Sequence, residues 1–411
     1  MAEPKVRFRR DDGSSYPAWN DVVLGDIATR VTRKNANGET DRPLTIASIE
    51  GLVDQRTYFG KTIASKDMSG YFLLKNGEYA YNKSYSAGYD YGSIKRLDKY
   101  DMGALSTLYI CFALNKDQNT DFYDCYFDGL SWYSQMPQIC AEGARNHGLL
   151  NVSPNDFFKI QLSVPSSKEE QQKIADFLSS VDDVITASEE EVANLETQKK
   201  AVMKKLFSQE VRFKRADGSD FPKWEEKPLE CIIKVIIDNR GKTPPLSKSG
   251  YPLIEISAVG DYYLRYEKIE KWVNQETYDN WFRKHLENGD LLFSTVGNTA
   301  QCTVYDEKEK CCVAQNIIGI RFDENTDSRF MFNVLTYEQN QKLIKSIQMN
   351  GVQPSVKVSQ LIKLSFSIAS LEEQRLIADF LSNFDEAIAA AKKELELWKE
   401  LKKGLLQQMF V

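Results

Sequence analysis

The chain has 411 residues, with 53 Lys and Arg against 59 Asp and Glu, so its formal charge at pH 7 is −6. A composition of 42% hydrophobic and 27% charged residues excludes a disordered or fibrous chain, and the length favours two or more domains. Because there is no run of 18 apolar residues and the seven cysteines form no C-x-x-C pair, we expect a cytoplasmic protein with reduced thiols.

The first predicted element, residues 1–19, contains a block that occurs a second time. Residues 6–19 read VRFRRDDGSSYPAW and residues 211–224 read VRFKRADGSDFPKW, with nine of 14 positions identical. A second pair of blocks, KEEQQKIADFLSSVDDVITA from residue 168 and LEEQRLIADFLSNFDEAIAA from residue 371, matches at twelve of 20 positions. Since the repeat unit is half of the chain, the sequence predicts two similar domains with a local two-fold relation.

Residues 20–165 are predicted to form a first globular domain. Candidate strands are 77–82 and 105–114, and aromatic residues at helical spacing predict a helix near 119–135. The domain has 15 basic and 17 acidic side chains, which weighs against a uniformly basic nucleic-acid surface. Local clusters nevertheless mix cations with Tyr, Asn and Ser, which can contact phosphates and base edges. The candidate DNA-binding residues are Arg30, Arg33, Lys34, Asn82, Lys83, Tyr85, Tyr89, Lys95, Arg96, Arg145 and Asn146.

A long helix is predicted over residues 166–207. Ser167 and Glu170 have the S-x-x-E spacing of a capping box. Behind them, apolar or small residues recur at 4-3-4-3 spacing, with Lys199 at one seam position, which is the pattern of a coiled coil. An unbroken helix of about 38 residues within this range is about 57 Å long, and Ser180 is a candidate position for a break.

Residues 208–224 hold the second copy of the N-terminal block, and residues 225–368 are predicted to form a second globular domain. Its candidate strands are 252–259, 290–296 and 316–322, with a helix near 327–348. It has 18 basic and 19 acidic side chains and shares little sequence with the first domain, as expected of two modules that read different ligands. The candidate DNA-binding residues here are Arg240, Lys242, Thr295, Asn298, Gln301, Gln315, Asn316 and Gln353. Asn and Gln can pair with adenine and Arg or Lys with guanine, although for each candidate an ordinary solvated loop is the alternative.

Residues 369–411 repeat the long helix, with Ser370 and Glu373 at capping-box spacing, Lys402 at a seam position and Asn383 as a candidate break. The predicted fold class is α+β. It consists of two similar mixed α/β globular domains in tandem, separated and joined by two long helices. The helices are expected to form an antiparallel coiled-coil pair with pseudo-two-fold, circular symmetry, so that the two termini lie close together.

Catalytic motifs are absent from the sequence. There is no G-x-x-x-x-G-K-[ST] phosphate loop, no G-x-G-x-x-G fingerprint and no G-x-S-x-G nucleophile elbow. The two histidines exclude a histidine-rich metal site, and the adjacent Cys311 and Cys312 are interpreted as packing residues. We therefore predict a non-catalytic chain without catalytic, cofactor-binding or metal-binding residues.

The paired blocks resemble those of the specificity subunits of type I restriction-modification enzymes. The resemblance rests on E-E-Q-x-x-I-A-D-F-L-S at 169–179 and 372–382, on the paired V-R-F…D-G-S…P…W blocks, and on the half-chain repeat. It covers essentially the whole chain and is weaker in the globular parts.

The resemblance implies a DNA-reading subunit in which 20–165 and 225–368 are target recognition domains, each reading one half of a gapped target. The helices would be a spacer and a docking surface for two modification subunits, which bind S-adenosylmethionine and methylate adenine. Two restriction subunits that use ATP and Mg would complete the assembly. The principal alternative is a structural adaptor that assembles partner proteins without reading DNA, and a stand-alone enzyme is a second alternative.

Overall fold

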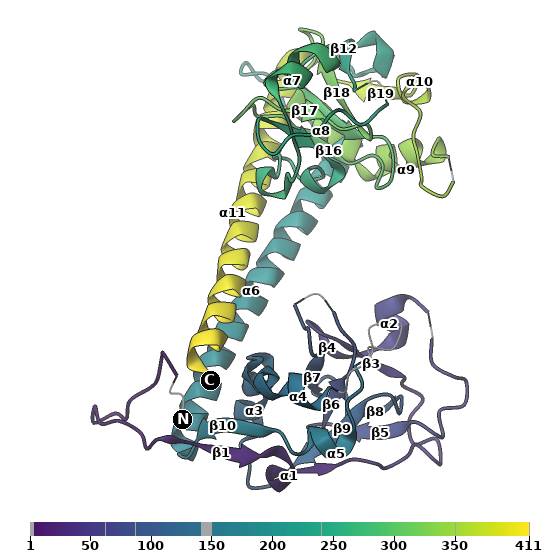
Figure 1. Cartoon of the computed structure of the whole chain (residues 1–411). Coiled ribbons are helices and arrows are strands. Elements are labelled where there is room, and N and C mark those ends of the chain that lie inside the picture. The colour runs from purple at the N-terminus through teal and green to yellow at the C-terminus, as the bar shows by residue number, and fades with distance from the viewer. Residues whose placement is uncertain are drawn as a thin grey trace. The chain divides into compact units, whose positions relative to one another are not determined.

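The computed structural model describes residues 4–61, 63–86, 88–140, 150–239, 241–349 and 351–410. The chain divides into two compact units, whose elements are labelled in Figure 1. Unit 1 comprises residues 1–188 together with 394–411, and unit 2 comprises residues 189–393. Within the described ranges, no helix has both the length and the apolar composition that a membrane span requires.

A four-stranded antiparallel sheet lies at the centre of unit 1. Its strand order is β2-β9-β6-β7, with the bounds Ala28–Arg30, Ile110–Leu114, Tyr79–Asn82 and Ser93–Arg96. Both β2 and β6 pair antiparallel with β9, so these two strands run in the same direction. Three two-stranded ladders accompany the sheet: β1 (Trp19–Val23) with β10 (Gln161–Pro165), β3 (Leu44–Ala47) with β4 (Gly51–Asp54), and β5 (Phe72–Lys75) with β8 (Met102–Leu105).

Aromatic side chains dominate the core of unit 1. Tyr79 and Tyr81 of β6 and Phe112 of β9 are fully buried and pack on Phe127 and Phe157 from helical segments. The short helical elements are α1 (Leu24–Ile27), α2 (Gln55–Phe59), α3 (Thr120–Asp128), η1 (Ser131–Gln135), α4 (Met136–Ile139) and α5 (Pro154–Phe157). The helix expected near 119–135 is thus confirmed as α3 followed by η1.

Unit 2 contains a sheet of the same design. Its order is β12-β18-β15-β16, with the bounds Ile233–Ile237, Ile317–Phe322, Leu291–Ser294 and Cys302–Val304, and all pairings are antiparallel. The other strands are β11 (Glu225–Pro228), β13 (Tyr251–Ile254), β14 (Trp272–Val273), β17 (Cys312–Val313) and β19 (Ser365–Ile368). The short helical elements are η2 (Leu229–Cys231), η3 (Ile256–Ala258), η4 (Tyr266–Lys268), α7 (Gln275–Trp281), α8 (Ser328–Thr336), α9 (Glu338–Ser346) and α10 (Val358–Leu361). The two sheets therefore share order and direction although their sequences differ.

Two expected elements are interrupted in the structure. The predicted strand 105–114 is split, because a turn in which the N–H of Tyr109 donates to the carbonyl of Ser106 (3.3 Å) separates β8 from β9. The predicted helix 327–348 divides at Tyr337, whose extended backbone (ψ 133°) separates α8 from α9.

The two long helices are confirmed as α6 (Lys168–Phe207) and α11 (Leu371–Met409). Neither breaks where Ser180 and Asn383 suggested a new helix start, so this expectation is wrong. The hydroxyl of Ser180 donates to the carbonyl of Phe177 (2.6 Å), which satisfies the side chain inside a continuous helix.

The capping box expected at the start of α6 is only half formed. The N–H of Glu170 donates to Oγ of Ser167 (3.4 Å), as a cap requires. The carboxylate of Glu170 does not return to the serine but is fully buried, where it accepts from Nε of Arg7 (2.7 Å) and Nε1 of Trp19 (3.3 Å). The role predicted for this glutamate is therefore wrong.

The start of α11 repeats this arrangement. The carboxylate of Glu373 is fully buried and is held by Arg212 (2.7 Å) and Trp224 (2.9 Å), while Oγ of Ser370 is buried without a hydrogen-bond partner among the described residues. The Val-Arg-Phe…Trp block is therefore repeated because each copy binds the glutamate of one long helix. We call each trio of Arg, Trp and Glu a clamp.

The lysines at the predicted seam positions form ion pairs within each unit. In unit 2, Lys199 of α6 lies 2.6 Å from Asp385 of α11, and both side chains are almost entirely buried. Burial lowers the pKa of Lys199 and raises the pKa of Asp385, although each partner acts in the opposite sense. In unit 1, Lys402 of α11 lies 2.7 Å from Asp182 of α6 in a more exposed position.

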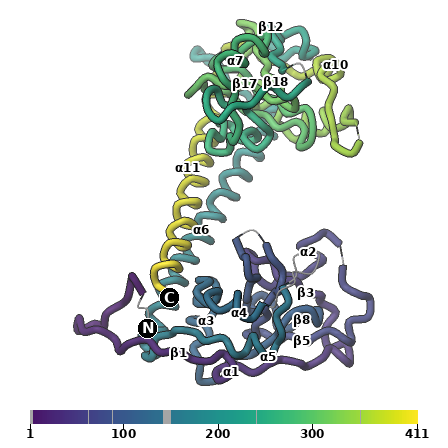
Figure 2. Tube along the Cα trace, in the orientation of Figure 1, coloured from purple at the N-terminus to yellow at the C-terminus, as the bar shows by residue number. Residues whose placement is uncertain are grey.

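The first and last described segments lie side by side in unit 1, as Figure 2 shows. The N–H of Val6 donates to the carbonyl of Gln408 (3.1 Å), and Met409 and Phe410 are buried in the core of this unit. The expected closeness of the two ends is confirmed.

Candidate nucleic-acid interface

Several predicted contact residues lie at one edge of the unit 1 sheet, the edge that is formed by the ends of its strands. β2 and β6 end at this edge with Arg30 and Asn82, and the loop that joins β6 to β7 follows. β9 begins at Ile110, which is 80 residues after Arg30 in the sequence. Because β2 and β9 are antiparallel, the end of β2 and the start of β9 lie at the same edge. Figure 1 shows β6, β7 and β9 of this sheet together.

Arg30 and Lys83 form a cationic site at this edge. Lys83 is half-buried, and burial followed by the charge of Arg30 lowers the pKa of its ammonium group. Among the residues that the structure describes, neither cation has an ion-pair partner. Tyr85 of the same loop is 60% exposed, while Asn82 uses its Oδ1 to accept from the N–H of Ser84 (3.1 Å). Two unpaired cations beside an exposed ring are suited to a phosphate backbone.

The other predicted cations of unit 1 already have partners. Arg33 pairs with Glu78 (2.7 Å), and Nζ of Lys34 donates to the carbonyl of Gly70 (2.9 Å). At β7, Lys95 pairs with Asp128 and lies over the ring of Tyr89, and Arg96 pairs with Asp98 and Asp121. Arg145 and Asn146 lie outside the described residues, as does Arg240 of the second domain.

The corresponding edge of the unit 2 sheet carries a cavity of about 430 Å³. β12 and β15 end here and β18 and β16 begin here, which is the arrangement of β2, β6, β9 and β7 in unit 1. The cavity is lined by Gly241, Ile256, Val296, Gly297, Gln315, Asn316 and Gln353. Three predicted residues, Gln315, Asn316 and Gln353, are thus brought together although the last is far from the others in sequence.

The remaining predicted residues of unit 2 surround this cavity without lining it. Thr295 is buried, and its backbone N–H donates to the carbonyl of the lining residue Asn316 (2.8 Å). Asn298 is exposed and Gln301 is half-buried in the β15–β16 loop, and Lys242 is exposed beside a turn. That turn is fixed by Asn239, whose side chain bonds to the N–H of Gly241 and the carbonyl of Lys242.

Ile256 and Val296 are the lining side chains that the sequence did not indicate. Ile256 follows a strand in an apolar run that reads as ordinary core. Gly297 itself was the available signal in the sequence, because a glycine in a loop allows the left-handed backbone found here (φ 83°) and a close approach of a ligand to the backbone.

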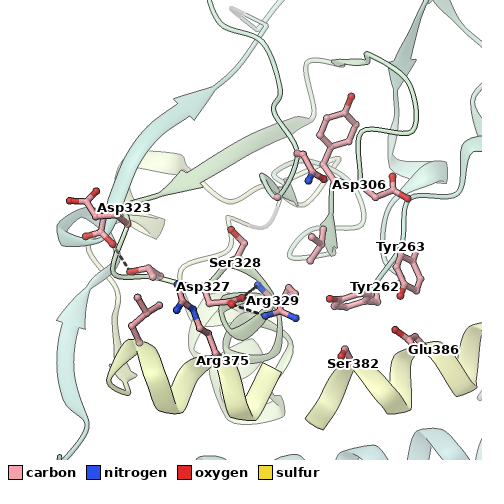
Figure 3. A pocket seen from close by; sticks show the side chains of 17 residues that line it. Tyr262, Tyr263, Asp306, Asp323, Asp327, Ser328, Arg329, Arg375, Ser382 and Glu386 are labelled. Atoms are coloured by element: carbon pink, nitrogen blue, oxygen red, sulfur yellow. Dashed lines mark hydrogen bonds and ion pairs between the residues drawn. The ribbon is translucent and has the colours of Figure 1, made fainter. Parts of the chain in front are cut away.

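A second hollow of about 550 Å³ lies at the opposite edge of the unit 2 sheet, beside α11 (Figure 3). Ser382 and Glu386 of α11 face Tyr262 and Tyr263 across it, and burial followed by the nearby Glu386 raises the pKa of Tyr263. The charged side chains of its lining are Asp306, Asp323, Glu324, Asp327, Glu386, Arg329 and Arg375. Arg329 is paired with Asp327 (2.9 Å) and Asp379 (2.6 Å), so carboxylates are in excess. We call this hollow the acidic cleft.

Two separate stretches of the chain, residues 19–197 and 222–397, match the family model described as type I restriction modification DNA specificity domain. The chain therefore belongs to this family, and the resemblance seen in its sequence is confirmed. Each matched stretch spans one globular part of the chain together with most of the long helix that follows it.

Similar curated proteins are specificity subunits from Methanocaldococcus jannaschii. The type I restriction enzyme MjaVIII specificity subunit is 24% identical over 271 residues, which cover 63% of this chain and 63% of the relative. The putative type I restriction enzyme MjaX specificity subunit is 26% identical over 211 residues, or 50% of this chain and 49% of the relative. The matches thus span between half and just under two thirds of these relatives.

Two solved structures share the fold over nearly the full chain. The S subunit of a type I restriction-modification system from M. genitalium has a TM-score of 0.54 at 14% identity, covering 100% of this chain and 99% of its own. A chain from a structure of a type I R-M system, described for its complex assembly and conformational transition, has a TM-score of 0.53 at 17% identity, covering 96% and 98%.

Proposed function

We propose that this chain is the DNA sequence-specificity subunit of a type I restriction-modification complex and reads a bipartite, gapped target. Residues 20–165 and 225–368 are the two target recognition domains in this proposal. The observation that carries it is that two sheets of equal design present different chemistry at corresponding edges: Arg30 and Lys83 in unit 1, and the amides of Gln315, Asn316 and Gln353 in unit 2. Related scaffolds with different contact surfaces suit two different half-sites.

The long helices, in the proposal, are the spacer that fixes the unread gap. An antiparallel coiled-coil pair with pseudo-two-fold symmetry is supported by ion pairs that run in opposite order: Glu196 with Lys392 and, further along α6, Lys199 with Asp385. The pair Lys402–Asp182 of unit 1 repeats Lys199–Asp385 with both residue numbers offset by 203. A continuous helix of 40 residues is about 60 Å long, more than the roughly 34 Å between half-sites one DNA turn apart.

The proposed chain is non-catalytic and acts with protein partners in the cytoplasm. Two modification subunits would carry S-adenosylmethionine and two restriction subunits would carry ATP and Mg, so this chain itself needs no cofactor. The excess of carboxylates in the acidic cleft supports a protein-facing role for that side of unit 2, since it would repel DNA phosphates.

The test is methylome sequencing of a host that expresses this chain together with its neighbouring modification subunit, with the chain deleted as the control. A gapped adenine-methylation motif that disappears with the chain supports the proposal and gives both half-sites. Methylation that is absent, or unchanged by the deletion, contradicts it and favours the adaptor.

A further inference from the structure

One residue that lines the cavity at the sheet edge of unit 2 has a buried polar atom without a partner among the described residues. Oδ1 of Asn316 is shielded from solvent and accepts no hydrogen bond from the residues that the structure describes. The backbone of this residue is fixed beside the end of β15, because its carbonyl accepts the N–H of Thr295 (2.8 Å). An unpaired buried acceptor costs free energy, and a donor from a ligand in the cavity would remove this cost once the side chain turns its Oδ1 toward it.

The lining of the cavity suits a nucleobase better than a phosphate. Its described side chains are the three amides of Gln315, Asn316 and Gln353 and the apolar groups of Ile256 and Val296. None of these described side chains carries a charge that would bind a phosphate. An amide presents a donor next to an acceptor, which matches a base edge of the opposite pattern.

On the basis of the proposed function, we infer that this cavity is the base-reading site of unit 2 and that Asn316 selects adenine in one half-site. Adenine presents the N6 donor beside an acceptor, N7 on the groove edge or N1 on the pairing edge, and both patterns fit an amide. Guanine presents two acceptors on its groove edge and is matched by Arg or Lys instead. Gln315 and Gln353 complete the polar lining beside Asn316.

The backbone around the cavity is held in place before any ligand binds. The N–H of Gly297 donates to the carbonyl of Pro354 (2.8 Å), and the N–H of Val356 donates to the carbonyl of Thr295 (2.8 Å). These bonds fix the segment that carries Gln353 against the β15–β16 loop. A rigid polar site loses little entropy on binding and therefore discriminates well between ligands.

The first test compares Asn316→Ala and Gln353→Ala with the control Gln339→Ala. Gln339 carries an exposed amide on α9 and lines neither the cavity nor the acidic cleft. The purified complex of the full chain with its modification subunit is used to select targets from a randomised DNA library. We expect Asn316→Ala to lower the preference for adenine at one position by about tenfold, with the other half-site unchanged and the control like the wild type.

Misfolding is separated from impaired recognition by the melting temperature. Because Oδ1 of Asn316 has no partner to lose, Asn316→Ala should melt at the wild-type temperature or above it. The inference is overturned if the variant keeps every base preference, or if its binding to all DNA sequences is weakened equally. In either case, a gapped target selected by the wild-type complex still supports the proposed function. A wild-type complex without any sequence preference would instead overturn the proposed function.

Base analogues distinguish adenine in a stacked duplex from adenine turned out of the stack. Loss of affinity with 7-deazaadenine at the selected position indicates that the groove edge is read. Loss with 1-deazaadenine but not with 7-deazaadenine indicates an unstacked base that is read on its pairing edge. Either result supports the inference, and full affinity with both analogues overturns it.

Discussion

The corresponding edges of the two sheets share their backbone plan and differ in their chemistry. In unit 1 the N–H of Leu150 donates to the carbonyl of Lys83 (2.7 Å), and in unit 2 the N–H of Val356 makes the matching bond to Thr295. A cation therefore occupies in one unit the place that a buried hydroxyl residue occupies in the other. The comparison teaches that this scaffold fixes where a contact surface lies, while the loop side chains decide what that surface can bind.

The largest expected effect tests whether the two scaffolds are equivalent. Glu170→Ala and Glu373→Ala each remove a fully buried carboxylate from a clamp, so that an arginine and an indole N–H lose this acceptor. Each variant should lower the free energy of unfolding by about 3–5 kcal/mol, measured by denaturant titration. Glu→Gln at the same positions is the control and should cost less, because an acceptor remains. A loss in only one unit would show that the clamps are not equivalent.

The next effect separates the two interhelical ion pairs by their burial. Lys199→Met should cost about 3 kcal/mol of unfolding free energy, since it leaves the buried Asp385 unpaired. The double variant with Asp385→Leu should recover most of this loss, because two apolar residues replace two desolvated charges. Lys402→Met in unit 1, whose partner Asp182 is 45% exposed, should cost below about 1 kcal/mol. Equal losses for both lysines would contradict this ranking.

A smaller effect distinguishes the cationic edge from the amide edge. Lys83→Ala and Arg30→Ala should weaken binding to all DNA sequences alike. Each should also reduce the dependence of log K on log salt by about 0.9 for every phosphate that the protein no longer neutralises. Fluorescence anisotropy at several salt concentrations measures both quantities. A change in base preference at a single position would instead make the residue a reader of bases.

The smallest effect concerns a predicted cation that is already neutralised. Arg33→Ala removes an exposed partner of Glu78 and should change the affinity for DNA by less than about twofold, in line with the small energies of surface ion pairs. A tenfold loss of affinity in the same anisotropy assay would show that Arg33 contacts DNA.

The scaffold could be predicted from the sequence because it is repeated. Twin blocks and heptads identified both long helices, and the seam positions of Lys199 and Lys402 indicated that the seam is not purely apolar. The contacts of Glu170 and Glu373 could not be predicted, since their local spacing favoured a helix cap. Their carboxylates instead bind arginines that are 163 and 161 residues away in the sequence. Local patterns cannot reveal such contacts.

The candidate surface was predicted only in part. Residue type marked Lys83, Asn316 and Gln353 as able to contact DNA, but the same reasoning marked Lys95 and Arg96, whose charges are taken by aspartates. Their partners come from α3, which reaches β7 only in the folded unit. Which cations stay unpaired therefore depends on tertiary packing that no single segment contains.

The burial of Phe410 means that the core of unit 1 is completed only after the C-terminal residues have been synthesised. Its ring packs on Phe122 and Tyr126 in the core of unit 1, and residues 394–410 are synthesised after the whole of unit 2. The unit that leaves the ribosome first is thus the last to be completed, and a chain that stops early has an unfilled core in its first half. Synthesis of unit 2 is in this way a condition for completing unit 1.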